Sequence, residues 1–212
     1  MLSRSETRVI KWLCRQIPAG VRPDHLTMVG MLGSVVVFAG FFLSNLGPAY
    51  LWLAAAGILI NWLGDSLDGS LARFRRCERW SYGFFVDHMT DVFSMGLIGL
   101  GAGLSPYVST TSSLLVLSAY LMLTVMSALE AKVRGVMRIS FGKVGPTEFR
   151  IFLLLLIGLL YFLPTQTLNL GNVSVNAYDA LLTVISAVLI IVCVGSALRI
   201  MAELDREDPQ PP

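Results

Sequence analysis

Residues 65–91 read DSLDGSLARFRRCERWSYGFFVDHMTD and carry four aspartates inside segments that are apolar enough to cross a membrane. An ionised carboxylate at membrane depth is costly unless a cation pairs with it, so four together indicate bound cations or a reaction. Because residues three or four apart share one face of a helix, Asp65 and Asp68 line one stripe of a helix, and Asp87 and Asp91 line a stripe of the next. If the two stripes face each other, their oxygens converge on a small volume. All-oxygen ligands suit hard divalent cations such as Mg²⁺ or Mn²⁺, and not zinc or copper.

The composition places the whole chain in a membrane. Of its 212 residues, 55% are hydrophobic and 14% are charged, and the mean hydropathy is +0.69. A soluble domain of this length carries about a quarter charged residues. We therefore predict an all-α integral membrane protein. Its six transmembrane helices are expected at residues 26–46, 49–73, 82–104, 111–133, 148–163 and 177–201.

The placement of basic residues predicts the orientation. All 16 Lys and Arg residues fall in the N-terminal segment, around 73–79, across 132–150, or from Arg199 onwards. The connections around 44–50, 104–110 and 163–176 contain none. This alternation is what the positive-inside rule predicts for six spans with both termini in the cytoplasm. The acidic site then faces the cytoplasm, and Arg75, Arg76 and Arg79 are expected to face lipid phosphates or only to set the topology.

Three segments are expected along the chain. Residues 1–22 form a cytoplasmic segment, in which 3–17 make an amphipathic interfacial helix with basic residues on one side and apolar residues on the other. A basic, solvated tail is the alternative there. Residues 23–203 form the six-helix catalytic domain. The short acidic, proline-ended segment 204–212 is expected to be disordered.

The spacing within 65–91 resembles the signature of the CDP-alcohol phosphatidyltransferase family, D-x2-D-G-x2-A-R-x8-G-x3-D-x3-D. The matching residues are Asp65, Asp68, Gly69, Ala72, Arg73, Gly83, Asp87 and Asp91. Nine residues instead of eight separate Arg73 from Gly83, and the extra one falls in the expected turn between two helices, where insertions are tolerated. A weaker similarity is PDHLT at 23–27, near the Pro-Asn-x-Leu-Thr that opens the first span in this family.

The resemblance implies an activity and a role for each carboxylate. An alcohol attacks a phosphorus of a CDP-linked substrate, CMP leaves, and two divalent ions, Mg²⁺ or Mn²⁺, neutralise the pyrophosphate. Asp65, Asp68 and Asp87 would hold the metals with help from Asp91, which is also the candidate base for the proton of the alcohol. The donor is expected to be CDP-diacylglycerol. The implied partners are the CDP-linked substrate, the alcohol acceptor, the lipid bilayer and a second copy in a homodimer, and no nucleic acid is expected.

The remaining motif residues are assigned to the substrates. Asp68, Gly69, Ala72, Arg73 and Gly83 would bind the nucleotide, although small residues also serve helix–helix packing. Topology alone explains most of a second basic group, at 132–150. If the acceptor carries a phosphate, the expected contacts within this group are Arg134, Arg138 and Lys143.

Other functions stay open. Within the same family, CDP-choline or CDP-ethanolamine could donate to diacylglycerol, and glycerol 3-phosphate, inositol or its phosphate, or serine could be the acceptor. An intramembrane prenyltransferase also grips a diphosphate with aspartates and Mg²⁺, but it carries two distant aspartate motifs. A cation carrier would spread its carboxylates through the membrane, whereas here they gather near one end.

Overall fold

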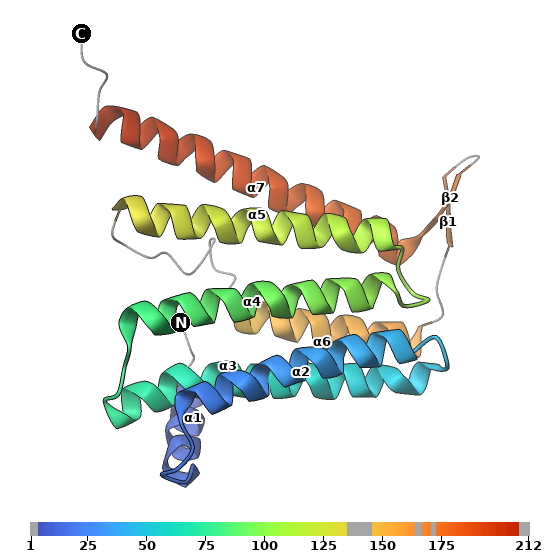
Figure 1. The fold of residues 1–212 in the computed structure, drawn as a ribbon. Helices are drawn as coiled ribbons and strands as arrows, with labels where there is room; N and C mark the ends of the chain where they lie inside the picture. Colours follow the sequence, from blue (N-terminus) through green and yellow to red (C-terminus); the bar gives the residue numbers. More distant parts are fainter. Residues whose placement is uncertain (1–3, 135–145, 164–166, 171–172, 208–212) are drawn as a thin grey trace.

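The computed structural model describes residues 4–134, 146–163, 167–170 and 173–207, and its elements follow one another as an almost entirely helical chain (Figure 1). The elements are α1 (Arg4–Gln16), α2 (Pro23–Leu43), the 3₁₀ turn η1 (Pro48–Tyr50), α3 (Leu51–Arg75), α4 (Trp80–Gly103), α5 (Thr110–Arg134), α6 (Pro146–Phe162), β1 (Thr167–Leu170), β2 (Val173–Asn176) and α7 (Ala177–Glu207).

The helices α2 to α7 run alternately up and down in one bundle. The N-terminal helix, the turn between α3 and α4, and the end of α7 lie at one end (Figure 1). The α2–α3 and α4–α5 connections and the β hairpin lie at the other end (Figure 1). The bundle therefore gathers its basic connecting segments, within the described residues, at a single end.

Four of the described helices are long and apolar enough to cross a membrane. They are α2, the continuous stretch Pro48–Arg75 that contains α3, most of α5 (Thr110–Val133), and α7. The apolar stretch of α6, Phe149–Phe162, is shorter than a typical span. Helix α4 is not among these four helices, and it carries Asp87 and Asp91 within its length. The fold is thus that of a helical, multi-pass membrane protein, and the count of six spans stays a prediction.

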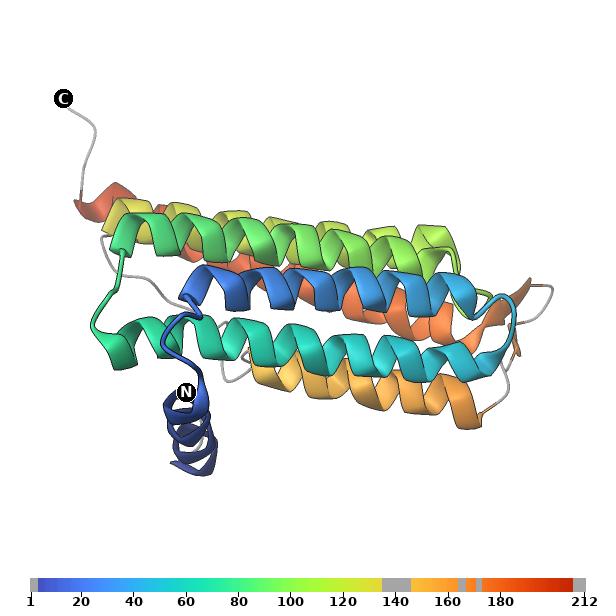
Figure 2. The same ribbon diagram turned by 60° about the horizontal axis from the view of Figure 1, so that its bottom comes forward.

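Helix α2 lies between α3 and α4 and contacts both (Figure 2). Its contact with α3 is made by glycines. A Cβ atom on Gly33 or Gly40 of α2 would overlap the backbone of α3, and one on Gly57 or Gly64 of α3 would overlap α2. Small residues let membrane helices approach until their backbones touch. Helix packing was the alternative role for Gly69, Ala72 and Gly83, but the close α2–α3 contact is made by Gly33, Gly40, Gly57 and Gly64.

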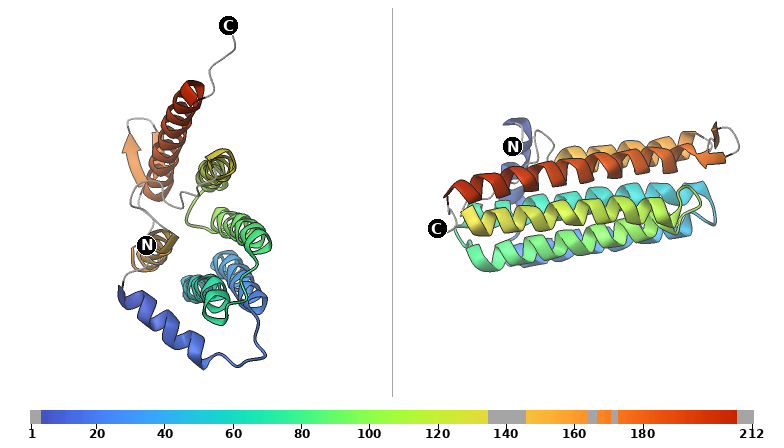
Figure 3. Two further views of the ribbon diagram at one scale, coloured as in Figure 1. Left: turned by 90° about the vertical axis from the view of Figure 1, so that its left-hand side faces the viewer. Right: turned by 90° about the horizontal axis from the view of Figure 1, so that it is seen from above.

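The N-terminal helix α1 is present over almost the whole expected range and lies across the end of the bundle (Figure 3). Ile10 and Cys14 are buried against Leu67 and Leu71 of α3. Trp12, in contrast, is 58% exposed. Part of the expected lipid-facing side is therefore a protein contact, and the location of α1 at a membrane surface stays a prediction.

Arg75 fastens this helix to α3. Its guanidinium donates hydrogen bonds to the carbonyl oxygens of Ile17 (3.0 Å), Pro18 (2.9 Å) and Val21, in the segment that follows α1. The expectation that Arg75 faces lipid or only sets topology was therefore wrong. Arg79 likewise pairs with Asp24 and lies over the ring of Tyr82. Both arginines were misassigned because sequence position alone does not show which backbone a long side chain reaches.

We expect Arg75→Ala to release α1 from α3. Burial raises the pKa of the Cys14 thiol, against the opposing charge of Arg75, and keeps it inert. In a Cys77→Ser/Cys193→Ser background, Arg75→Ala should speed maleimide labelling of Cys14 by about tenfold, because local opening exposes the thiol. Arg76→Asn is the matched control, since Arg76 is exposed and adopts a left-handed conformation (φ 53°) that asparagine tolerates. Equal labelling rates in the two variants would contradict the anchoring role.

Two segments differ from expectation. The uncharged connection at 163–176 contains an antiparallel hairpin, with Thr167 opposite Asn176 and Leu170 opposite Val173. The dipeptide Gly171-Asn172, between two short runs with apolar residues, is a hairpin signal in the sequence. Helix α7 continues to Glu207, so the first four residues of the expected disordered tail are helical, and 208–212 lie outside the described residues. An i,i+4 ion pair between Arg199 and Glu203 (2.8 Å) supports this extension.

Candidate active site

Three of the four aspartates line one small cavity between α2, α3 and α4. Asp65 and Asp68 reach it from α3, and Asp91 reaches it from α4. The described residues that line it are Thr27, Gly30, Met31, Asn61, Asp65, Asp68, Thr90, Asp91 and Ser94. The two acidic stripes therefore face each other for these three residues. The packing of α2 between α3 and α4 closes one wall of the cavity.

Asp87 stands apart from this lining. It lies one turn before Asp91 on α4, and its side chain is 53% exposed. Nδ1 of the neighbouring His88 lies 3.9 Å from Oδ2 of Asp87, and the same nitrogen contacts the carbonyl oxygen of Phe84 at 2.9 Å. The charges of Asp65 and Asp87 still interact, so the four carboxylates form one electrostatic cluster with Asp87 at its open end.

The carboxylate of Asp68 is held from both sides. Thr27 on α2 donates its hydroxyl proton to Oδ2 at 2.7 Å, and the backbone N–H of Gly69 donates to Oδ1. Local spacing could not predict that Thr27 pairs with Asp68, because the two residues lie 41 positions apart in the chain. The threonine was visible in the sequence only within the similarity at 23–27.

A polar network lies in the bundle interior beside the carboxylates. Asn61 donates its amide protons to the carbonyl of Gly30 (3.1 Å) and to the hydroxyl of Ser34 (2.9 Å). Ser34 in turn donates to the hydroxyl of Ser94 at 2.8 Å. The network joins α2, α3 and α4 at one level, and buried networks of this kind fix one relative placement of helices. The network involves Asn61, one turn before Asp65 on α3, and Ser94, one turn after Asp91 on α4.

Arg150 of α6 reaches the same cluster. Its Nη2 lies 2.7 Å from Oδ2 of Asp65, and the residue is only 6% exposed. Among the described residues its Nε finds no hydrogen-bond partner. From the sequence, Arg150 was interpreted as part of the basic group at 132–150, most of which topology explains. The signal that could have found it is its position within the apolar stretch that begins at Phe149.

The nucleotide candidates lie at the basic end of α3 and α4. A Cβ atom on Gly83 would meet no described atom within 4 Å, and one on Gly69 would touch only the flexible side chain of Arg73. Arg73 is exposed and donates to the hydroxyl of Ser70 at 3.3 Å, and Ala72 is half-buried. These glycines therefore do not pack one described helix against another. Their backbones are open to an approaching ligand.

The expected acceptor contacts cannot be placed. Arg138 and Lys143 lie outside the described residues. Arg134 ends α5, and its side chain is also outside the described part. Their assignment stays a prediction from the sequence.

The residues around the cavity fit a hard divalent cation by chemistry. Carboxylates, hydroxyls and an amide supply oxygen, and the described residues bring no thiolate or imidazole to the cavity lining. Among the described residues, no three Asp, Glu, His or Cys side chains lie close enough to share one ion. Instead, Arg150 holds Asp65 and Thr27 holds Asp68. The donor set is therefore suitable, and its members are held by partners within the protein.

Comparisons with known proteins agree with this geometry. The model of the CDP-alcohol phosphatidyltransferase family matches residues 21–194. An archaetidylinositol phosphate synthase of Methanothermobacter thermautotrophicus is 31% identical over 105 residues, which are 50% of this chain and 51% of the relative. The match thus spans about half the length of that relative.

A solved structure has the same fold. The crystal structure of the phosphatidylinositol phosphate synthase of Mycobacterium tuberculosis with CDP-DAG bound superposes with a TM-score of 0.60 at 23% identity, over 91% of this chain and 92% of that one. At this identity the likeness concerns the fold. The family model, in contrast, covers most of the chain and includes all four aspartates of the cluster. The chain therefore belongs to the CDP-alcohol phosphatidyltransferase family.

Proposed function

We propose that this protein is a membrane enzyme of phospholipid synthesis that transfers a phosphatidyl group from CDP-diacylglycerol to an alcohol and releases CMP. The observation that carries the proposal is the convergence of Asp65, Asp68 and Asp91 on one cavity. The chain that holds this cavity belongs to the CDP-alcohol phosphatidyltransferase family. Four carboxylates are retained in apolar helices at a cost in stability, so they serve a reaction rather than the fold.

Asp65, Asp68 and Asp87, with help from Asp91, would hold two Mg²⁺ or Mn²⁺ ions. When bound, such ions neutralise a pyrophosphate and stabilise the departing CMP. Hydrogen bonds from the Thr27 hydroxyl and from the Gly69 N–H orient the two carboxylate oxygens of Asp68, which supports this role. Asp87 would meet the part of the substrate that enters from solvent, and the exposure of its side chain supports this role.

In the proposed step, the oxygen of the acceptor hydroxyl forms a bond to the phosphorus that carries the lipid. The bond from that phosphorus to the oxygen shared with CMP breaks, and CMP leaves with the electron pair. Asp91 accepts the proton of the attacking hydroxyl. Its position on the cavity lining, deeper than Asp87, supports this assignment. The Asn61–Ser34–Ser94 network would hold α4 so that Asp91 stays beside the reacting atoms.

The CMP part of the substrate is proposed to lie at the open end of α3 and α4. Gly69 and Gly83 leave the backbone accessible there, and Ala72 adds no bulk. Arg73 is exposed at the same end and would contact the phosphates or the ribose. Asp68 would link this nucleotide site to the metal site.

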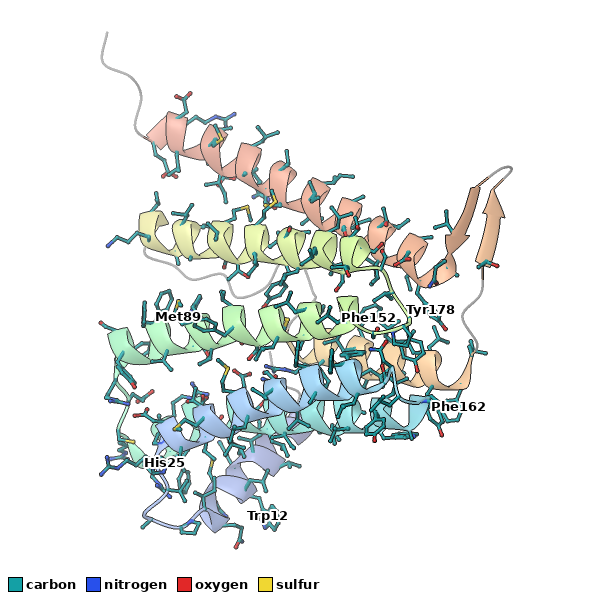
Figure 4. All side chains as sticks on the ribbon, turned by 45° about the vertical axis from the view of Figure 1, so that its right-hand side comes forward. Trp12, His25, Met89, Phe152, Phe162 and Tyr178 are labelled. Carbon is teal, nitrogen blue, oxygen red and sulfur yellow. The ribbon has the colours of Figure 1, made fainter. Side chains whose placement is uncertain are left out.

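A second, larger cavity supports a lipid substrate. It lies between α4, α5, α6 and α7, and its lining is almost wholly apolar. Tyr120, Phe149 and Phe152, the last of which is labelled in Figure 4, lie on this lining. Arg150, which reaches the acidic cluster, directly follows Phe149 on α6. An acyl chain is the ligand that such a lining suits.

The acceptor is proposed to be an alcohol that carries a phosphate, with an inositol phosphate first among the candidates. The names of the archaeal relative and of the mycobacterial structure both support this class. Arg134, Arg138 and Lys143 remain the proposed contacts. We also propose six membrane crossings, both termini and the active site on the cytoplasmic side, and, on the resemblance alone, a homodimer. The gathering of basic segments at one end of the bundle supports the orientation.

The test is CMP release by the purified protein with Mn²⁺ or Mg²⁺. CDP-diacylglycerol, CDP-choline and CDP-ethanolamine are each paired with a panel of acceptors that includes inositol phosphate, glycerol 3-phosphate, inositol, serine and diacylglycerol. We expect acceptor-dependent release from CDP-diacylglycerol that vanishes with a chelator, because the carboxylates cannot neutralise a pyrophosphate alone. Release only from CDP-choline or CDP-ethanolamine with diacylglycerol would reverse the arrangement. No release from any pair, by folded protein that binds Mn²⁺, would overturn the proposal and favour the prenyltransferase or the carrier.

A further inference from the structure

Arg150 is buried, and the described residues pair with only part of its guanidinium. The residue is 6% exposed, and among the described residues its side chain makes one ion pair, Nη2 to Oδ2 of Asp65 at 2.7 Å. Its Nε finds no acceptor among the described residues. A buried guanidinium loses its hydration and is retained where a strong negative charge compensates it. Here that charge is the acidic cluster.

The influence of Arg150 extends beyond Asp65. Its charge also acts favourably on Asp87 and Asp91, whereas the carboxylates of the cluster repel one another. Arg150 therefore supplies, from α6, positive charge that compensates part of the negative charge of the cluster.

We propose that Arg150 is an internal counter-cation that competes with divalent metal for Asp65. The inference rests on the metal site of the proposed function. A dication bound to Asp65 would lie close to the guanidinium in an environment of low dielectric constant, so the two positive charges would repel. Metal binding then requires the Asp65–Arg150 ion pair to loosen, and the affinity for metal is lower than the carboxylates alone would give.

This competition has a consequence for the order of binding. A guanidinium displaced from Asp65, beside bound cations, leaves the cavity with surplus positive charge and free N–H donors. Such a site favours a polyanion. Metal is therefore expected to bind first and the phosphate-bearing substrate second, because only the metal-loaded cluster has reversed its sign.

The experiment measures Mn²⁺ binding in the absence of any substrate, by titration calorimetry of the purified protein. Arg150→Met removes the charge and keeps an unbranched side chain. We expect it to tighten Mn²⁺ binding by about tenfold, within the usual range of coupling between two sites. Without metal the variant should unfold at a lower temperature than the wild type, because Asp65 loses the cation that pairs with it. Tighter binding then means that saturating Mn²⁺ stabilises the variant more than the wild type, so this difference in unfolding temperature should narrow.

Two controls separate competition from a general effect of charge. Arg199→Met removes an exposed guanidinium that pairs with Glu203 on α7, and it should leave the Mn²⁺ affinity unchanged. In an Asp65→Asn background Arg150 no longer has a carboxylate at position 65 for which it competes with the metal. Arg150→Met should therefore change the Mn²⁺ affinity of the remaining carboxylates much less. If methionine prevents folding, Arg150→Gln also removes the charge and carries the same expectation.

The outcomes distinguish this inference from the proposed function. Tighter Mn²⁺ binding in Arg150→Met, with a much smaller change in the Asp65→Asn background, supports the competition. Mn²⁺ binding to the wild type that Arg150→Met leaves equal or weakens would overturn the competition and leave the metal site standing. Absence of Mn²⁺ binding to folded wild-type protein would overturn the metal site itself, and the competition with it.

Discussion

Asp68→Asn is expected to abolish CMP release, with a loss of about a thousandfold or more in kcat, as is usual when a group central to a reaction is removed. The amide keeps the size of the side chain but removes its charge, and its NH₂ group is a donor. Thr27 and the N–H of Gly69 both donate to the present carboxylate, so at least one of them would meet a donor instead of an acceptor. The site would lose both a proposed metal ligand and at least one of the hydrogen bonds that orient it.

The measurement is the rate of CMP release as a function of Mn²⁺ concentration. Asp179→Asn is the matched control, since it makes the same chemical change at the first turn of α7, far along the chain from the cluster. Asp179 accepts a hydrogen bond from the N–H of Ser109 at 2.7 Å, which an amide oxygen can also accept. This variant should keep wild-type turnover. If Asp68→Asn kept turnover within about tenfold of the control, with the same Mn²⁺ dependence, the assignment of Asp68 would be wrong.

Gly64→Ala is expected to destabilise the fold by about 1–3 kcal/mol, the usual effect of inserting a methyl group into a filled interface. A Cβ at this position would lie 2.5 Å from the Cα of Gly30 and 2.7 Å from the carbonyl oxygen of Leu26. Both atoms belong to the backbone of α2, so no side chain can rotate away and the helices must separate. Gly64 directly precedes Asp65, and Leu26 directly precedes Thr27, so this separation would also disturb the site.

The measurement is the thermal unfolding temperature in detergent, together with CMP release. Gly195→Ala on α7 is the matched control, because a Cβ there meets no described atom within 4 Å. In a helix, alanine is intrinsically preferred over glycine by about 1 kcal/mol, so the control should be neutral or slightly stabilising. An unfolding temperature for Gly64→Ala equal to that of the control would show that α2 and α3 can separate without cost.

Parts of the site could be predicted because they depend on local periodicity. Residue spacing predicts that Asp65 and Asp68 share one helix face and that Asp87 and Asp91 share a face of the next helix. The sequence left open whether the two faces meet, and the cavity that Asp65, Asp68 and Asp91 line together shows that they do for these three residues. The expected span at 148–163 is also helical, as α6, and this helix begins two residues earlier because proline is favoured in the first helical turn. The roles of these residues in metal binding and catalysis remain predictions.

Other parts were missed because they depend on distant partners. Arg150 pairs with a residue 85 positions away, and Arg75 reaches carbonyls more than 50 positions away. The positive-inside rule already explains a basic residue near a membrane surface, so its local sequence does not indicate a second role in pairing with a distant residue. The hairpin at 167–176 was missed for a different reason, since its turn signal was present in the sequence and was not used.

The sequence by itself determined that this chain enters a membrane as helices, that its carboxylates share helix faces, and that it resembles a known family. These properties depend on hydrophobicity and on the fixed geometry of a helix, which act over a few residues. Only the tertiary structure decided that α2 lies between α3 and α4 on a contact of glycines, and that Arg150 is buried against Asp65. Such pairings arise from the packing of whole helices against one another, and no local period in the sequence encodes which face meets which.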